Sequence, residues 1–157
     1  IAASKGWDTM NPRLVNWVHL KERSTGKEFR YWNTHLDHKG QKAREHGAAM
    51  IVQASAVFPK ELPQLLSGDM NAAPNNPAIK NFKDGGWIDT FVAVNGDKET
   101  GPTAHGFKGP KTESKNKIDY VFCRGPVKPL ASTIIRDSRN GHYPSDHYFI
   151  SAEVMIG

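Results

Sequence analysis

Four short polar clusters hold most of the side chains in this sequence that could bind a cation or move a proton. They lie at residues 33–38 (NTHLDH), 67–71 (SGDMN), 117–120 (KIDY) and 144–147 (PSDH). Together they supply histidines, carboxylates and a carboxamide, which can position a water, bind a hard divalent cation and stabilise charge on phosphate oxygens. Each cluster alone is better explained as a turn or a helix cap. The chemistry therefore depends on the fold bringing several clusters together.

The elements that must position these clusters can be predicted from apolar spacing. Alternating apolar residues predict strands at 14–20 and 29–34, and the STGK sequence between them makes the pair a hairpin. Apolar residues recur at helical spacing over 41–58, so this segment is expected to be one long amphipathic helix. Residues 63–71 predict a short apolar strand that ends abruptly in Gly-Asp. Candidate chemistry is therefore expected at the carboxyl end of a strand.

The second half of the chain is dominated by short strands. A run of strands with one long helix predicts mixed α/β layers rather than a regular parallel βαβ series. The elements expected here are a short helix from Pro77, a segment at 87–94 that is ambiguous between helix and strand, a basic loop at 101–116, and strands at 118–124, 130–136 and 148–156.

Composition narrows the class of protein without choosing a function. The chain has 157 residues with 21 Lys and Arg against 16 Asp and Glu, a net charge of +5 that favours anionic partners such as nucleic acid, phosphate esters or lipid headgroups. Its single cysteine, Cys123, excludes an internal disulfide and is expected to be a small buried apolar residue. No apolar run is long enough for a membrane span, so a soluble protein is expected, with the cytoplasmic or exported compartment left open.

The motifs NTHLDH, SGDMNA, KIDYVF and SDH, in this order and at these intervals, resemble the later motifs of the endonuclease/exonuclease/phosphatase superfamily. Residues 6–8, 12–13 and 103–107 (GWD, PR and TAHGF) further resemble a bacterial-type branch. The resemblance implies an α/β (α+β) fold, the DNase I-like two-sheet β-sandwich flanked by helices. It also implies a Mg²⁺- or Mn²⁺-dependent phosphoesterase, with nucleases among the candidates.

The resemblance further implies a role for each matched residue. His35 would contact the scissile phosphate, Asp69 would orient or deprotonate the attacking water, and Asn71 would donate to the phosphate. Asp119 would hold His147 in its tautomer and orientation, and whether Asp69 or His147 removes the proton is left open. In an extended segment, residues i and i+2 point the same way, so Asp69 and Asn71 are expected on one side of the site. The expected metal ligands are Asp146, Asp69 and Asn71.

The family's first two motifs, an asparagine and a metal-binding glutamate, have no match in residues 1–157. Glu22, Glu28 and Glu45 do not stand in the glutamate's context. We therefore expect a partial domain, the C-terminal half and a little more, with weak metal affinity. A second copy or an N-terminal half would then cover the exposed sheet face. The alternative is a catalytically silent fragment that binds phosphate or nucleic acid.

Several other residues invite a functional interpretation. The H-x-D-H pattern that ends at His38 resembles part of a zinc hydrolase motif, but Asn33 stands where the first ligand would be. His105 and Lys117 are possible substrate-side residues, because their loop leads into the KIDY cluster. The lysine-rich segment 108–117 is expected to be a solvated loop, with contact to a phosphodiester backbone as the alternative. The remaining histidines are expected at the surface and the tryptophans in packing: His19, His46, His142, Trp7, Trp17, Trp32 and Trp87. The substrate stays open among nucleic acid, phosphoinositide, sugar phosphate and phospholipid headgroup.

Overall fold

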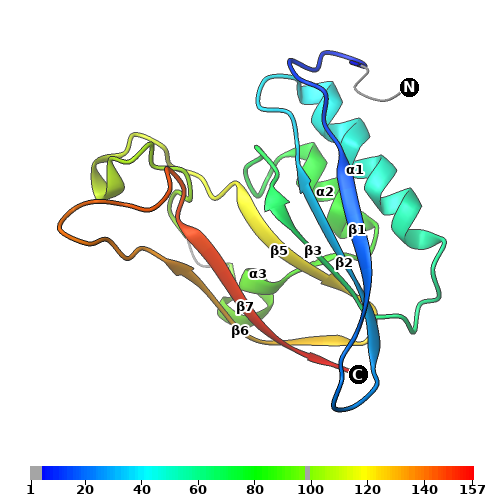
Figure 1. The fold of residues 1–157 in the computed structure, drawn as a ribbon. Coiled ribbons are helices and arrows are strands. Elements are labelled where there is room, and N and C mark those ends of the chain that lie inside the picture. Colours follow the sequence, from blue (N-terminus) through cyan, green and yellow to red (C-terminus); the bar gives the residue numbers. More distant parts are fainter. Residues whose placement is uncertain (1–4, 98–99) are drawn as a thin grey trace.

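The computed structural model describes residues 5–97 and 100–157 and contains a five-stranded sheet, a two-stranded sheet and a few helices (Figure 1). This is the mixed α/β fold that the sequence predicts. The larger sheet has the order β1 (Val15–Lys21), β2 (Glu28–His35), β3 (Gln64–Asp69), β5 (Asp119–Arg124) and β4 (Ile88–Asp89). The smaller sheet pairs β6 (Val127–Ile135) with β7 (Phe149–Ile156). The helices are α1 (Gln41–Ala56), α2 (Pro77–Asp84), α3 (Thr90–Asn95) and the short 3₁₀ helix η1 (Gly109–Lys111).

The connections of the larger sheet decide which strand ends meet. Strands β1 and β2 form the expected antiparallel hairpin. Helix α1 then carries the chain back so that β3 runs parallel to β2, and β5 runs antiparallel to β3. Parallel strands have their carboxyl ends at the same edge, and an antiparallel neighbour brings its amino end there. The ends of β2 and β3 and the beginning of β5 therefore share one edge of the sheet.

The core lies between this sheet and the helices α1 and α2. Trp32, Leu66 and Phe122 come from neighbouring strands and are at most 1% exposed. They pack against apolar residues of the two helices, and the indole of Trp32 donates to the side chain of Gln64 at 3.0 Å. Because side chains alternate along a strand, the neighbours of these residues point to the opposite face. The last residues of β2 and β3 lie on that opposite face.

The ambiguous segment at 87–94 contains both elements. It begins with β4 and turns into α3 at Asp89, whose side chain accepts a hydrogen bond from the backbone N–H of Phe91 at 2.9 Å. Asp89 still pairs with Phe122 as the last residue of β4, and its extended backbone is the one that an N-cap residue needs, so the helix begins at the next residue. Asp89 is also nearly buried, at 5% exposure. The segment therefore leads from the edge strand β4 directly into α3, with a buried carboxylate at the junction.

The sequence-based expectations for the remaining residues are partly met. Trp32, Trp87 and Cys123 are buried, whereas Trp7 and Trp17 keep 59% and 46% of their surface exposed. Trp7 stacks on the exposed ring of His46, with 4.4 Å between the ring centres. Within the part of the chain that the structure describes, no helix combines the length and apolar character needed to cross a bilayer.

Candidate active site

Three polar side chains form one row at the shared edge of the sheet. His35 ends β2, Asp69 ends β3 and Asp119 begins β5, and the strand register places His35 beside Asp69 and Asp69 beside Asp119. Nε2 of His35 lies 3.4 Å from Oδ2 of Asp69, whose side chain is only 15% exposed. Residues that are 84 positions apart along the chain therefore meet because of strand pairing.

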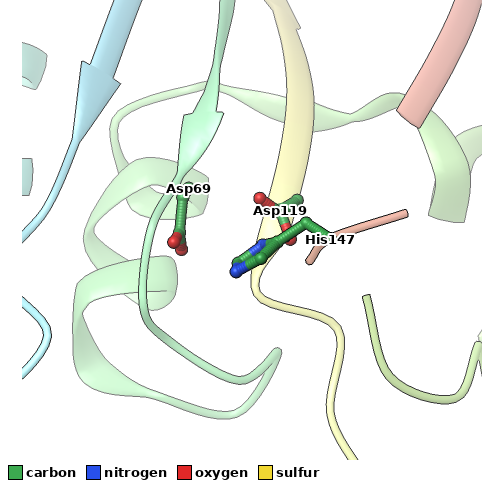
Figure 2. Close-up of side chains that lie close together, drawn as sticks. All are labelled: Asp69, Asp119 and His147. Carbon is green, nitrogen blue, oxygen red and sulfur yellow. The ribbon is translucent and has the colours of Figure 1, made fainter. Parts of the chain in front are cut away.

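His147 joins this row from the loop before β7. Its Nδ1 lies 2.9 Å from Oδ2 of Asp119, which is the contact that the sequence predicts for this pair. Figure 2 shows the imidazole reaching between the carboxylates of Asp69 and Asp119. A proton on Nδ1 donates to Asp119, which leaves Nε2 on the other side of the ring available for proton transfer. The pair thus has the orientation of a histidine whose tautomer is fixed by a carboxylate.

Asn71 reaches the site by a different geometry from the one expected. Strand β3 ends at Asp69, and Asn71 has a left-handed backbone with φ of 46°. The backbone N–H of Asn71 donates to Oδ1 of Asp69 at 2.7 Å, so a tight turn replaces the extended segment. Nδ2 of Asn71 lies 3.0 Å from Nε2 of His35 and donates to the carbonyl of Leu36 at 3.0 Å. The amide is close to Asp69, but because of this turn and not because of strand alternation.

The charges in this row shift two pKa values. Burial raises the pKa of Asp69 above its ordinary value; the N–H of Asn71 opposes the rise and the negative charge of Asp119 adds to it. For His147, burial lowers the pKa, but the hydrogen bond to Asp119 and the nearby carboxylates outweigh it, so the pKa is raised. The site therefore concentrates negative charge, which favours protons or other cations.

The donor set fits a hard divalent cation. Ligand atoms of Asp69, Asp119 and His147 all lie within 4.8 Å of one another. Carboxylate oxygens with one imidazole suit Mn²⁺ and Mg²⁺, and a cation would offset the charge repulsion between the two carboxylates. Asp146, an expected ligand, is exposed and outside this group, and its backbone carbonyl accepts the N–H groups of His105 and Gly106. Of the two expected aspartate ligands, Asp69 belongs to this group and Asp146 does not.

The two candidates for the substrate side lie inside the fold instead. His105 is 1% exposed and Lys117 is 2% exposed. The ammonium group of Lys117 forms an ion pair with Asp89 and lies 4.3 Å from the ring centre of Tyr120. Burial lowers the pKa of Lys117, and the charge of Asp89 opposes this shift. This ion pair links the segment just before β5 to the N-cap of α3. Because Asp89 already neutralises the charge of Lys117, the lysine has a structural role in the fold.

The carboxylate of the first motif, Asp37, has a role that the sequence did not reveal. Asp37 accepts four backbone N–H groups, at distances between 2.7 and 3.1 Å, from Met10, Asn11, Lys39 and Gly40. Although burial opposes its ionisation, these donors hold the pKa of Asp37 far below its ordinary value. His38 is exposed, with Nδ1 3.1 Å from a guanidinium nitrogen of Arg13. The NTHLDH motif thus contributes His35 to the site and Asp37 to the fold.

Asp8 is a further residue whose role depends on the folded chain. Its carboxylate accepts the backbone N–H groups of Lys42 and Ala43, in the first turn of α1, at 3.2 and 2.8 Å. Gly40, the residue before the helix, has no side chain that could serve as a cap. Asp8 therefore caps α1 from a distant position. The GWD sequence marked this region, but the spacing did not indicate a cap.

Comparison with known proteins places this geometry among related domains. Residues 5–147 match the model described as Endonuclease/Exonuclease/phosphatase family. A solved endonuclease/exonuclease/phosphatase family protein from Bacteroides thetaiotaomicron is 31% identical, with a TM-score of 0.81, over 96% of this chain and 58% of its own. A mannosyl-6-phosphatase from Bacteroides thetaiotaomicron VPI-5482 is 27% identical, with a TM-score of 0.81, over 97% and 60%.

A third solved structure is similar to this chain with a higher TM-score. The endonuclease/exonuclease/phosphatase from Bacteroides vulgatus is 26% identical, with a TM-score of 0.87, over 98% of this chain and 59% of its own. The chain therefore spans 58–60% of the length of these three structures. No curated protein sequence matches it.

Proposed function

Because the chain belongs to the endonuclease/exonuclease/phosphatase family, we propose that it hydrolyses phosphate esters with a water activated beside Asp69 and His147. The observation that carries the proposal is the 2.9 Å contact between His147 and Asp119, with one ligand atom from each of Asp69, Asp119 and His147 within 4.8 Å of the others. A fixed imidazole beside a carboxylate can move a proton and stabilise developing negative charge.

Each residue of the row has a distinct task in this proposal. Asp119 keeps the proton on Nδ1 of His147, so that Nε2 faces the reacting atoms. The raised pKa of His147 favours its protonated form, which donates to a phosphate oxygen. Asp69 orients the attacking water and accepts its proton. The bond from the water oxygen to phosphorus forms as the bond from phosphorus to the leaving oxygen breaks, and the leaving oxygen takes its proton from solvent.

His35 and Asn71 bind the phosphate in this scheme. Their nitrogen atoms lie 3.0 Å apart, and the His35 side chain is 56% exposed, so a substrate oxygen can approach the pair. A bound Mg²⁺ or Mn²⁺ would supply Lewis-acid polarisation of the phosphate oxygens. Asp69 is the central ligand of the proposed metal site, with Asn71, Asp146 and Asp119 as the neighbouring candidates. Glu22, Glu28 and Glu45 are not among the proposed metal ligands.

The test compares three variants of the full-length protein on bis-p-nitrophenyl phosphate with Mg²⁺ or Mn²⁺. His147→Ala is expected to lower kcat/KM by about a hundredfold or more, because a proton-transfer or charge-stabilising group is lost. Asp69→Ala is expected to have a loss of at least that size. His46→Ala is the matched control, since His46 is an exposed histidine that stacks on Trp7. Equal rates for all three variants would contradict the proposal.

The substrate class is chosen by a second measurement. One neighbour, 27% identical to this chain, is named as a mannosyl-6-phosphatase, which supports testing sugar 6-phosphates beside oligonucleotides, phosphoinositides and phospholipid headgroups. The substrate with the highest kcat/KM defines the class, because specificity is a ratio of kcat/KM values.

A silent phosphate-binding unit is the second candidate, because the chain offers no match for the family's metal-binding glutamate. On this interpretation Mn²⁺ binds weakly, and hydrolysis appears only when a second copy or an N-terminal half is added. Titration of Mn²⁺ with parallel measurements of hydrolysis and of mass by size exclusion distinguishes the two candidates. Hydrolysis by a monomer of these residues alone would exclude the silent interpretation.

A further inference from the structure

We infer that His105 is a positioning residue that sets the contact between His147 and Asp119. This inference rests on the proposed function for its catalytic consequence, but its structural part stands on contacts inside the protein. The His105 ring is 1% exposed and packs against two tyrosines that also contact each other. Its centre is 4.1 Å from that of Tyr148 and 4.6 Å from that of Tyr143. The ring is therefore held in a buried aromatic cluster.

The backbone around His105 connects the two members of the pair. The N–H groups of His105 and Gly106 both donate to the carbonyl of Asp146, at 2.8 and 2.9 Å. Ala104 forms an antiparallel bridge with His147 itself, and the N–H of Tyr148 donates to the carbonyl of Thr103 at 2.7 Å. Residues 103–106 thus hold the backbone on both sides of His147.

The same segment also holds Asp119. The hydroxyl oxygen of Thr103 accepts the backbone N–H groups of Ile118 and Asp119, at 2.9 and 3.2 Å. Thr103 is fully buried, so these hydrogen bonds are protected from water. Residues 103–106 are therefore a bracket, attached to Asp119 at one end and to His147 along its length. A shift of this bracket changes the 2.9 Å separation of the two side chains.

A histidine is suited to anchor the bracket for a specific reason. Nδ1 of His105 accepts the backbone N–H of Gly109 at 3.2 Å, which closes the turn over the ring. Gly109 has φ of +55°, and a Cβ there would lie 2.1 Å from the hydroxyl of Tyr143, so the turn packs closely against that side chain and requires glycine. A phenyl ring would keep the packing but leave this N–H unpaired.

The experiment compares His105→Phe with His105→Asn in the full-length protein, using bis-p-nitrophenyl phosphate and Mn²⁺. His105→Phe is expected to lower kcat about 10- to 100-fold, because small displacements of a catalytic group have effects of this size, while KM changes less than about twofold. His105→Asn retains an acceptor and should lose less activity; it also serves if the Phe variant does not fold. His46→Phe is the matched control and is expected to keep the wild-type kcat.

A spectroscopic measurement separates this inference from the proposed function. The proton on Nδ1 of His147 is expected to give a downfield ¹H signal in wild-type protein, which shifts or disappears in His105→Phe and persists in His46→Phe. Folded His105→Phe or His105→Asn protein with the wild-type signal and kcat would overturn the inference. If wild-type protein hydrolyses no phosphate ester, the proposed function fails, but this signal still decides whether His105 positions the pair.

Discussion

Asp37 lies just after β2 and Asp69 is the last residue of the neighbouring parallel strand β3, yet the two carboxylates have opposite surroundings. Asp37 is 1% exposed and accepts four backbone N–H groups, so its pKa lies far below the ordinary value. Asp69 accepts only one backbone N–H, from Asn71, and its pKa is raised by burial and by the negative charge of Asp119. A buried carboxylate whose oxygens are fully paired stabilises a fold, whereas one left with unpaired capacity beside like charge can take up a cation or a proton.

The largest expected effect is on the chemistry of Asp69. Asp69→Asn should lower kcat/KM about a thousandfold, because the amide cannot accept the water's proton and is a weaker metal ligand. Its stability should stay within about 0.5 kcal/mol of wild type or increase, since a like-charge contact with Asp119 is removed. Steady-state kinetics and urea unfolding measure the two quantities. Loss of stability without loss of activity would reverse the roles of the two aspartates.

Asp37→Asn should have the opposite pattern. In the wild type, both carboxylate oxygens of Asp37 accept backbone N–H groups. The asparagine would place its own NH₂ group against two of these donors and leave them unpaired, so the free energy of unfolding should fall by about 3 kcal/mol. At a temperature where the variant is folded, kcat is expected to change less than about threefold. Urea unfolding followed by circular dichroism checks the first number. A stable variant with a large loss of kcat would show that Asp37 acts in the reaction.

Asp119→Asn should have the next effect, because it leaves His147 in place while changing its partner. The amide can present an N–H to Nδ1 and stabilise the wrong tautomer, so kcat should fall about a hundredfold. The downfield ¹H signal of His147 should be lost in the same variant. Retention of both the signal and the rate would show that the 2.9 Å contact does not orient His147.

The pH dependence of stability should differ in sign between the two aspartates. Folding favours the ionised form of Asp37, so its contribution is present above the unfolded pKa of about 3.9 and is lost as the pH falls. Folding disfavours the ionised form of Asp69, so its cost disappears as the pH falls through the raised folded pKa. Between about pH 7 and pH 2, Asp37→Asn should therefore lose less stability than wild type and Asp69→Asn more. Equal slopes in unfolding experiments would contradict this difference.

The smallest expected effect is that of His46→Ala. The ring of His46 is exposed and stacks on Trp7, so the free energy of unfolding should change by less than about 0.5 kcal/mol. Hydrolysis should keep its wild-type kcat/KM. A large loss of activity here would mean that the region around Trp7 takes part in catalysis.

The local elements were predictable because their signals are local. The hairpin of β1 and β2, the long helix α1 and the strand β3 were found from apolar periodicity and from Gly or Pro at their ends. The contact between His147 and Asp119 was predicted from the motif resemblance, and the structure contains it. The catalytic and metal-binding roles of the matched residues stay predictions.

Residues whose environment is set by distant segments were not predictable. The sequence indicates loop residues at His105 and Lys117, but His105 packs against the tyrosines at 143 and 148, and Lys117 forms an ion pair with Asp89. Asp8 caps α1 across more than thirty positions, which no spacing rule indicates. The sequence alone determined which side chains could do chemistry and on which elements they lie, because composition and periodicity are properties of neighbouring residues. Strand register and long-range packing decided that Asp37 accepts four backbone N–H groups while Asp69 accepts one, because burial and hydrogen bonding exist only once the chain has folded.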